Sequence, residues 1–459
     1  MIWAKMKNWV FARMSDNANP RCGAAFVAVI AALLLSACGA TARLPVSAGT
    51  GTHPQLPEPT SSVFPVVHVA KAKGWPENAA PVALAGTRVN AFARGLVHPR
   101  WLYVLPNGDV LVAETNAPYR PRDAGGLRGW FMQRFMKRAG ATVPSPDRIT
   151  LLRDADGDGV AELRTVFLSN LHSPFGMELV GNSLYIANTD ALLRFDYVPN
   201  ATRILTPGEK VLDLPAGDIN HHWTKNVIAS PDGRQLFVTV GSNSNIAENG
   251  LAAEADRASV WLVDPALRSH RIFASGLRNP NGMAWEPSTR KLWVVVNERD
   301  ELGSDLVPDY MTSIADQDFY GWPYSYFGAH VDSRVTPQRP DMVATARTPG
   351  YALGPHTASL GLAFAPAGTL RATMPAGMFV GQHGSWNRKP FSGYKVLFVP
   401  FRDGLPAGNT IDVLTGFVNS ADEAYGRPVG VALDRSGSLL VADDVGNVIW
   451  RVSGHTGSP

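Results

Sequence analysis

Short apolar runs alternate with turn signals rich in Gly, Pro, Asn and Asp after residue 86 of the chain. Runs of this length, bounded by such residues, predict β-strands, and turns such as PNG, PDG and RSG suit tight hairpins between them. Helical periodicity is rare; residues 126–140 (GLRGWFMQRFMKRAG) predict a short helix within an insertion. The pattern therefore predicts an all-β domain over residues 86–455.

One motif recurs six times within this domain: a polar or Pro-Gly lead-in, an apolar strand, a turn and a second apolar strand. Its copies occupy residues 98–115, 173–189, 221–243, 278–298, 357–368 with the strand that follows, and 427–444. A hairpin cannot bury its apolar face alone, so the repeated sheets must pack on one another. Radial packing of four-stranded sheets gives a β-propeller, and six copies predict six blades.

The lead-ins of such a ring lie near its central channel, where polar side chains from different blades converge. Four lead-in residues carry chemistry suited to a site, namely His222, Arg278, His356 and Arg427. Successive strand side chains point to opposite faces, so only one of the adjacent histidines His221 and His222 is expected in the channel. We assign this position to His222; a purely structural, hydrogen-bonded histidine is the alternative.

The N-terminus predicts export. Basic residues precede an apolar run over residues 22–38, which is short for a membrane span and ends in small residues. Its end, Leu35-Ser36-Ala37-Cys38, resembles the bacterial lipobox, in which the cysteine is lipidated. We therefore predict a lipoprotein signal peptide over residues 1–37 and a periplasmic protein anchored through Cys38, with the outer membrane favoured. The alternatives are an ordinary signal peptide cut near Ala40, and translation starting at Met6 or Met14.

Residues 38–85 follow the predicted signal. This segment is rich in Pro, Thr and Gly and has no helical period, which predicts a disordered, flexible tether between the lipid anchor and the propeller.

Composition narrows the range of partners. Hydrophobic residues at 45% and charged residues at 18% are typical of a globular protein. The net charge of +3 comes entirely from the predicted leader, so the mature chain is neutral and nucleic acid is not an expected partner. The chain has two cysteines, Cys22 and Cys38, and no Cys-x-x-Cys-His motif; neither a disulfide nor a covalent c-type haem is expected in the propeller.

Several stretches carry a family resemblance in their order along the repeat: HHWTKNVIASPDG, GLRNPNGMAW, NERDELGSDLVPDY, FYGWPYSYFG, GQHGSWNR and RPVGVALDRSGSLLVADD. Together, over about residues 86–453, they resemble the pyrroloquinoline quinone (PQQ) dependent glucose/sorbosone dehydrogenases, which are exported six-bladed propellers. NERDELGSDLVPDY and GQHGSWNR point to the sorbosone-dehydrogenase-like branch. The resemblance implies oxidation of a sugar or a related aldehyde or alcohol by hydride transfer to PQQ. The electron acceptor, a cytochrome or a membrane quinone, stays open.

The resemblance also implies roles for single residues. His222 matches the family's general base, and Arg278 would stabilise charge that develops on a quinone oxygen. The soluble glucose-type members carry an aspartate that orients the histidine; the matching position here is Ser242, which brings no charge. PQQ carries three carboxylates, which arginine binds well. The expected cofactor-binding residues are Asn279, Arg299, His356, Arg388 and Arg427.

Calcium has two candidate sites. The resemblance implies a Ca²⁺ beneath the quinone, for which Asp300 and Glu301 would supply carbonyl oxygens. The second site is the stretch DADGDGVAE (154–162), in which Asp154, Asp156 and Asp158 match the start of an EF-hand loop. Position twelve of that loop is Thr165 rather than Glu, so a true EF-hand is not expected. A structural Ca²⁺ and a solvated acidic turn stay as alternatives.

Two other functions stay open besides the dehydrogenase. A non-enzymatic propeller that binds a glycan or protein would keep the blades but could dispense with a channel histidine and converging arginines. A calcium-dependent propeller hydrolase, such as a lactonase, would place several Asp, Glu and Asn side chains around a central metal. The lead-ins of this chain are richer in Arg and His, which favours the dehydrogenase.

Overall fold

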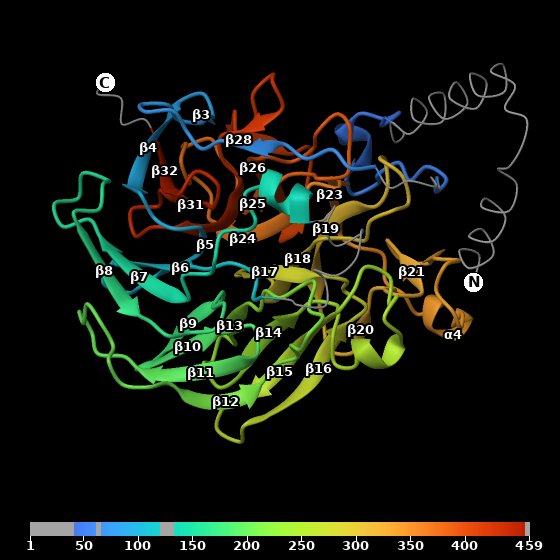
Figure 1. The fold of residues 1–459 in the computed structure, drawn as a ribbon, viewed down its shortest axis with the longest axis horizontal. Helices are drawn as coiled ribbons and strands as arrows, with labels where there is room; N and C mark the ends of the chain where they lie inside the picture. Colours follow the sequence, from blue (N-terminus) through green and yellow to red (C-terminus); the bar gives the residue numbers. More distant parts are fainter. Residues whose placement is uncertain (1–40, 61–65, 120–132, 455–459) are drawn as a thin grey trace, which may run out of the picture.

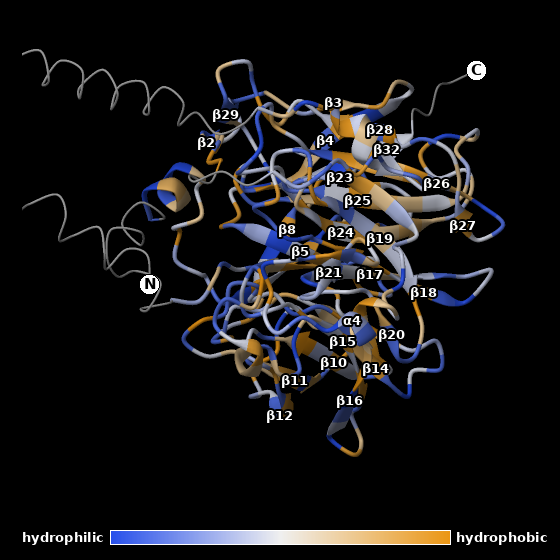
Figure 2. Cartoon of the chain, turned by 90° about the vertical axis from the view of Figure 1, so that its right-hand side faces the viewer, coloured by the Kyte–Doolittle hydropathy of each residue, from blue (hydrophilic) through white to orange (hydrophobic). Residues whose placement is uncertain are grey.

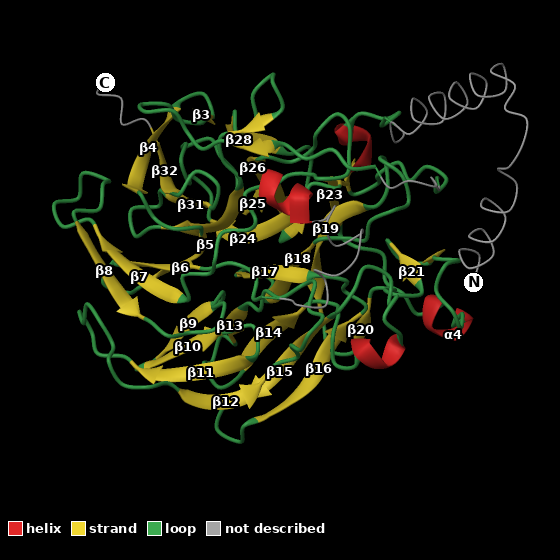
Figure 3. Cartoon of the chain, viewed as in Figure 1, coloured by secondary structure: helices red, strands yellow, loops and turns green. Residues whose placement is uncertain are grey.

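Strands predominate in the protein (Figure 3). The computed structural model describes residues 41–60, 66–119 and 133–454, which excludes the predicted signal peptide and Cys38. Part of the predicted 126–140 helix lies in the described range, and residues 133–138 are helical. None of the helices in the described ranges is long and apolar enough to cross a membrane. The other short helices are η1 (Val46–Gly49), η3 (Leu251–Glu254) and α4 (Pro340–Val343).

Six antiparallel sheets follow one another around a ring in chain order (Figure 1), as the six-fold repeat predicts. From the ring axis outward, the first sheet contains β5 (Pro99–Val104), β6 (Val110–Glu114), β7 (Arg148–Arg153) and β8 (Leu163–Leu168). The second contains β9 (Met177–Val180), β10 (Ser183–Ala187), β11 (Ala191–Asp196) and β12 (Glu209–Asp213). The third contains β13 (Val227–Ala229), β14 (Leu236–Val240), β15 (Ser259–Asp264) and β16 (Ser269–Ser275), with β20 (Asp318–Phe319) added in parallel.

The remaining three sheets complete the ring. The fourth contains β17 (Pro280–Glu286), β18 (Lys291–Val296), β19 (Pro308–Ile314) and β23 (Tyr351–Pro355). The fifth contains β24 (Ser359–Ala365), β25 (Gly377–Gln382), β26 (Lys395–Arg402) and β28 (Ile411–Thr415), with β27 (Leu405–Pro406) paired to β26. The sixth contains β30 (Pro428–Leu433), β31 (Leu439–Asp443), β32 (Val448–Gly454) and β4 (Thr87–Arg94). A separate small hairpin joins β21 (Ser325–Tyr326) and β22 (His330–Val331).

The last blade closes the ring. Its outer strand β4 comes from the N-terminal side of the domain and pairs antiparallel with β32 from the C-terminal end. Blue β4 therefore lies beside red β32 in Figure 1. The predicted six-bladed propeller is confirmed, and each copy of the motif forms the two innermost strands of one blade.

The hydrophobic core is divided among the interfaces between neighbouring blades. Each of six clusters of buried apolar side chains joins two adjacent blades; the cluster around Trp101 and Met177, for example, joins the first and second. Because a blade is covered on both faces, inner strands such as β6, β14 and β31 are buried throughout and read as continuous apolar runs. In Figure 2 much of the hydrophobic colour falls on strands and much of the hydrophilic colour on loops.

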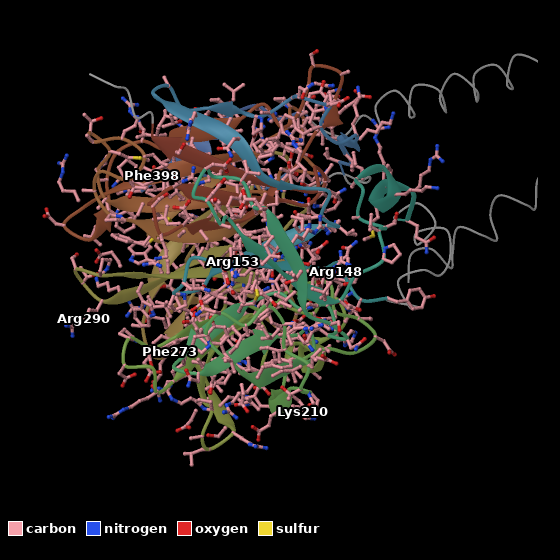
Figure 4. The ribbon with its side chains drawn as sticks, turned by 90° about the vertical axis from the view of Figure 1, so that its left-hand side faces the viewer. Arg148, Arg153, Lys210, Phe273, Arg290 and Phe398 are labelled. Carbon is pink, nitrogen blue, oxygen red and sulfur yellow. The ribbon has the colours of Figure 1, made fainter. Side chains whose placement is uncertain are left out.

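Ion pairs in the first blade connect β7 to β6. Arg148 and Arg153, labelled in Figure 4, are the first and last residues of β7. Arg148 Nε donates to Glu114 Oε1 at 3.0 Å, and Arg153 Nε donates to Asp109 Oδ1 at 2.6 Å. Both acceptors are buried, so these pairs satisfy carboxylates that the blade removes from water.

Glycines let the innermost strands approach one another closely. Consecutive innermost strands contact each other all around the ring. A Cβ on Gly361 of β24 would overlap the carbonyl oxygen of Val429 in β30, and a Cβ on Gly282 of β17 would lie 2.6 Å from Leu362 N. These positions therefore require glycine for packing.

The N-terminal segment differs from the predicted flexible tether. In its described parts, β1 (Thr50–Gly51) pairs with β23, β3 (Val82–Ala83) pairs with β28, and β2 (Lys71–Ala72) pairs with β29 (Glu423–Ala424). Outer strands of blades offer unpaired backbone groups, and an extended segment can satisfy them with few apolar side chains. Composition alone therefore did not distinguish a packed strap from a tether.

Replacing Gly361 with alanine is expected to lower the free energy of unfolding by about 3 kcal/mol, because the new methyl group would overlap backbone that cannot move without opening the ring. Gly437→Ala is the control: a Cβ there meets no atom within 4 Å, and its positive φ of 80° costs about 1 kcal/mol of backbone strain. Denaturant unfolding of both variants measures the difference. Equal costs would contradict the packing requirement at the ring axis.

Candidate active site

The lead-ins place polar side chains at the start of the innermost strands. His222 precedes β13 and Arg278 precedes β17, while His356 and Arg427 precede β24 and β30. His222 is partly buried, whereas His221 is exposed. The two histidines thus differ in burial as expected, but they lie in a bend before β13, so strand alternation is not the reason.

Hydrogen bonds define which nitrogen of His222 carries a proton. Nδ1 lies 3.0 Å from the carbonyl oxygen of Ser242 and 2.8 Å from its Oγ. A carbonyl can only accept, and Ser242 Oγ donates its own proton to the carbonyl of Ser244 at 2.7 Å. Nδ1 must therefore be the protonated nitrogen. Nε2 has no hydrogen-bond partner among the described residues, so the neutral ring presents its lone pair there.

The surroundings of His222 favour this neutral form. Burial lowers its pKa well below the usual value, and the positive charge of Arg278 and the neighbouring His221 lower it further. Ser242 orients the ring without adding a negative charge. His222 is therefore an uncharged imidazole near pH 7, with a free acceptor on Nε2.

Gly241 allows His222 and Asn279 to lie together. A Cβ at this position would be 2.5 Å from His222 Cβ and 2.6 Å from Asn279 Oδ1. Oδ1 of Asn279 is buried and has no hydrogen-bond partner among the described residues. A buried amide oxygen without a donor is uncommon in native structures and indicates a missing partner.

The carboxylate of Asp300 gathers groups from two blades. Its Oδ2 lies 3.0 Å from Arg278 Nη2, and its Oδ1 accepts from Asn387 Nδ2 at 2.8 Å. His356 Nδ1 is 3.4 Å from Oδ1. Burial alone would raise the pKa of Asp300, but Arg278, His356 and Asn387 outweigh it and hold the pKa at about 2. Asp300 is thus ionised and fixes Arg278 beside His222.

Asp444 forms a second centre in which the first, fifth and sixth blades meet. Its Oδ2 lies 2.9 Å from His383 Nε2, 2.6 Å from Arg100 Nη1 and 3.8 Å from His98 Nε2. Burial lowers the pKa of His383 to about 4 despite the opposing charge of Asp444. Burial likewise lowers the pKa of His98.

Arg427 adds an aromatic contact and spare donors to this second centre. Its guanidinium lies over the ring of Tyr394, 5.1 Å from the ring centroid. It is 4% exposed, yet its Nε and one Nη have no hydrogen-bond partner among the described residues. A buried guanidinium with open donors is suited to an anionic ligand.

Unpartnered buried polar atoms recur at these two centres. They are Arg278 Nε, Asn279 Oδ1, Asn387 Oδ1, Arg427 Nε and Nη2, Arg100 Nε and Asp444 Oδ1. Buried polar groups are almost always hydrogen-bonded, so this concentration indicates a polar ligand. The donors belong to three arginines, which fits a flat ligand that carries several carboxylates, as PQQ does.

Sequence reasoning missed Asp444, His383, His98 and Arg100. His98 occupies the lead-in of the first blade, so the repeat itself could have found it. The other three lie beyond the lead-ins, and only the fold brings them to Asp444. Lys225 was also missed; it is fully buried, and its Nζ donates to the carbonyls of His222 and Trp223 at 3.3 and 3.4 Å.

Arg388, an expected cofactor contact, makes hydrogen bonds to the protein backbone. Its Nε donates to Ser304 O at 3.0 Å, one Nη to Pro390 O at 2.9 Å and the other to Leu44 O at 2.8 Å. All three nitrogens are therefore occupied by backbone carbonyls. Arg388 joins the N-terminal segment to the loop that carries Asp300, and its Nη2 also lies 3.5 Å from Asp305 Oδ1.

The expected cofactor residues Arg299 and His356 also bind protein groups. Arg299 forms a buried ion pair with Asp332 and donates to the carbonyl oxygen of Asp300 from Nη2 at 2.7 Å and from Nε at 3.2 Å. His356 Nε2 lies 2.8 Å from Gly303 O. Both residues therefore hold the Asp300 loop in shape.

The acidic stretch 154–162 lies in the hairpin between β7 and β8, in the outer half of the first blade. Oxygens of its carboxylates lie within 4.8 Å of one another; they belong to Asp154, Asp156, Asp158 and Glu162. The structure thus adds Glu162 to the three predicted ligands. These residues are separate from the lead-ins, and a calcium ion here stays a prediction.

Comparisons of the sequence give related families and proteins. A sequence model described as TrAA12-like matches residues 148–317 and 331–455. The chain is 25% identical over 336 residues to an uncharacterised protein of Borreliella burgdorferi, covering 68% of this chain and 86% of that one. It is 24% identical over 373 residues to a pyrroloquinoline quinone-dependent pyranose dehydrogenase of Coprinopsis cinerea, covering 66% of this chain. The match spans 50% of that enzyme, about half its length.

Solved structures share the fold. The Family AA12 carbohydrate-active enzyme of Trichoderma reesei superposes with a TM-score of 0.66 at 17% identity, covering 84% of this chain and 99% of that one. The PQQ domain of the Coprinopsis cinerea pyranose dehydrogenase gives a TM-score of 0.65 at 20% identity, covering 84% and 100%. At these identities the likeness shows the propeller fold alone.

The position of Arg388 yields a test of its structural role. Arg388→Gln should increase tryptic cleavage after Arg43 about tenfold, because a hydrogen bond from a charged group is worth about 1.5–3 kcal/mol and one such bond holds Leu44. Lys389→Gln is the matched control, since this neighbour has an exposed side chain. Mass spectrometry of timed digests measures the cleavage. Unchanged cleavage in Arg388→Gln would show that the hydrogen bond from Arg388 does not hold Leu44 in place.

Proposed function

Since this chain belongs to the TrAA12-like family, we propose that it is a PQQ-dependent oxidoreductase that oxidises a sugar or a related aldehyde or alcohol. The observation that carries the proposal is His222, which presents an unprotonated Nε2 beside the fixed charge of Arg278. The name of the Coprinopsis cinerea relative supports the cofactor and the class of substrate.

The residues with open donors would hold the cofactor. Arg427 and Arg100 would bind its carboxylates, and Arg278 with Asn279 would bind its polar edge nearest His222. When bound, PQQ supplies a two-electron acceptor for the hydride that leaves the substrate carbon. Tyr394 and Asp444 fix the orientation of Arg427 and Arg100, so these guanidinium groups need little rearrangement to bind an anion.

His222 removes the proton of the substrate hydroxyl. Nε2 takes that proton while the hydride leaves the carbon, and the carbonyl product keeps the electrons of the O–H bond. Ser242 holds the ring through Nδ1 during the transfer. The imidazolium that forms lies close to Arg278, which favours rapid release of its proton. Asp300 keeps Arg278 in place and balances its charge.

Rival functions fit these residues less well. A calcium-dependent hydrolase would place its carboxylates around a metal at the ring axis, but the acidic cluster of the described residues lies on the outer hairpin of the first blade. A non-enzymatic propeller could use the open arginine donors to bind a ligand, but it would have no need of an unprotonated Nε2 on His222.

Finer features of the proposal rest on the sequence. The sorbosone-type substrate, the acceptor (a cytochrome or membrane quinone) and a structural Ca²⁺ at residues 154–162 stay predictions. Export to the periplasm and membrane contact through a lipid on Cys38 also stay predictions, because Cys38 lies outside the described residues.

His222→Gln should lower kcat by about 10²- to 10⁴-fold, the usual contribution of a general base, because glutamine cannot take the proton. PQQ should still bind, since its proposed ligands are unchanged. Steady-state kinetics with an aldose and a dye acceptor, together with PQQ absorption, measure both effects.

His221→Gln is the matched control, because both histidines open the same lead-in and misfolding would damage both variants. The exposed His221 should be dispensable for chemistry. Wild-type kcat in His222→Gln, or equal losses in the two variants, would show that another group takes the proton.

The pH profile should reflect the depressed pKa of His222. Only the neutral ring can accept a proton, and neutrality persists down to the pKa, which lies well below 6.5. The value of kcat/KM should therefore stay level as the pH falls through 6.5 and decline only in more acidic buffer. The residual activity of His222→Gln should lack this acidic decline. A wild-type midpoint at or above pH 6.5 would contradict the electrostatics of the site.

A further inference from the structure

The loop that carries Asp300 departs from the calcium site expected beneath the cofactor. We propose that the guanidinium of Arg299 takes the place of that divalent cation, so that the protein binds PQQ without calcium at residues 297–305. The inference rests on the proposed function, because it concerns the same cofactor.

The carbonyl oxygen of Asp300, one of the two expected calcium ligands, is already surrounded by donors. Arg299 approaches it with Nη2 at 2.7 Å and Nε at 3.2 Å. Asn245 Nδ2 lies at 3.3 Å and Arg334 Nη2 at 3.4 Å. Calcium would need to lie about 2.3–2.6 Å from the same oxygen. Two guanidinium groups occupy its approach, and both would repel it.

The carboxylates of Asp300 and Glu301, the two expected ligand residues, are also paired with cations. Asp300 pairs with Arg278 and accepts from Asn387, and Glu301 Oε2 lies 3.4 Å from Arg334 Nη1. These carboxylates therefore have positive partners without a metal. Calcium favours anionic oxygen ligands, and here it would have to compete with arginines for them.

Arg299 cannot easily leave the loop. Its side chain is 1% exposed and is paired with Asp332, which is 2% exposed. Withdrawal of the guanidinium would leave the buried carboxylate of Asp332 with only the more distant Arg334 Nε, at 3.7 Å, which is unfavourable. The three cations Arg278, Arg299 and Arg334 face the three anions Asp300, Asp332 and Glu301. The loop also carries Asp305, which pairs with Arg388, and Glu298, whose pKa burial raises to about 8, so its charges balance near pH 7 without a divalent ion.

The replacement of a calcium ion by the guanidinium of Arg299 has a physical consequence for the cofactor site. A guanidinium supplies a permanent positive charge and directional N–H donors, and it cannot dissociate. Its charge is half that of calcium and is shared with Asp332. The loop would thus keep its shape through the covalent chain and its hydrogen bonds. A loop that is organised by a metal ion takes its shape only when the ion binds.

Titration of PQQ into the protein tests the proposal. Apoprotein dialysed against EGTA is titrated with PQQ, followed by tryptophan fluorescence, with EGTA alone or with excess CaCl₂. The expected dissociation constants agree within about threefold. Binding at least tenfold weaker in EGTA, in the wild type and in the control below, would overturn the proposal.

Asp156→Asn with Asp158→Asn is the control, because it disables the other candidate calcium site while leaving the Asp300 loop unchanged. If calcium tightens PQQ binding in the wild type but not in this variant, calcium acts through the outer hairpin, and the proposal stands. A failure of PQQ to bind under either condition refutes the proposed function and this inference with it, whereas calcium dependence in the control refutes this inference alone.

Substitution of Arg299 tests its role directly. Arg299→Gln removes the nearer of the two guanidinium groups from Asp332 and from the Asp300 carbonyl, so its PQQ binding should become calcium-dependent by tenfold or more. Arg299→Lys keeps the charge and should remain calcium-independent. Calcium-independent binding of wild-type strength in Arg299→Gln would overturn the assignment. If circular dichroism shows that Arg299→Gln does not fold, the wild-type titration decides the question.

Discussion

The close packing of the innermost strands around the ring axis is the constraint on which the other features depend. Glycines such as Gly361 and Gly282 bring backbone against backbone where a single methyl group would overlap. Lead-ins from different blades are thereby carried to a common centre. Polar side chains in such a crowded place lose water, and only part of their hydrogen-bonding capacity can be met by neighbouring blades. The open donors of Arg278 and Arg427 follow from this geometry.

Two carboxylates organise the site, the partly buried Asp300 and the buried Asp444. Asp300 receives Arg278 and Asn387, and Asp444 receives His383 and Arg100. Buried ion pairs add little net stability, because the cost of desolvation offsets their attraction. Here the ion pairs act by positioning the cations. Each carboxylate binds some of the N–H groups of its cationic partners and leaves their other N–H groups free for a ligand. A ligand with several carboxylates can then bind to guanidinium groups that are already ordered.

The repeat predicts the fold well because every blade needs the same apolar hairpin. It also places His222 in a lead-in, although the bend before β13, and not strand alternation, separates His222 from His221. The roles of Arg388 and Arg299 could not be read in this way. Both lie in family motifs at the expected positions, yet their nitrogens bind carbonyls of Leu44 and Asp300, which are chosen by tertiary contacts. The N-terminal strap was missed for the same reason. Its pairing uses backbone groups, which every sequence possesses.

Ser242, which departs from the expected family pattern, and Arg278, which matches it, change the charge around His222 in the same direction. Ser242 orients the ring with neutral oxygens where an aspartate was expected, so no negative charge stabilises the imidazolium. Arg278 lies near the ring and disfavours the proton further. The result is a base that is weaker in strength but available over a wider range of pH. A weaker base can suffice when the fixed positive charges of the site stabilise the electrons that the substrate loses. The proton and the hydride then leave the substrate together. Neither proton transfer nor hydride transfer has to be completed before the other.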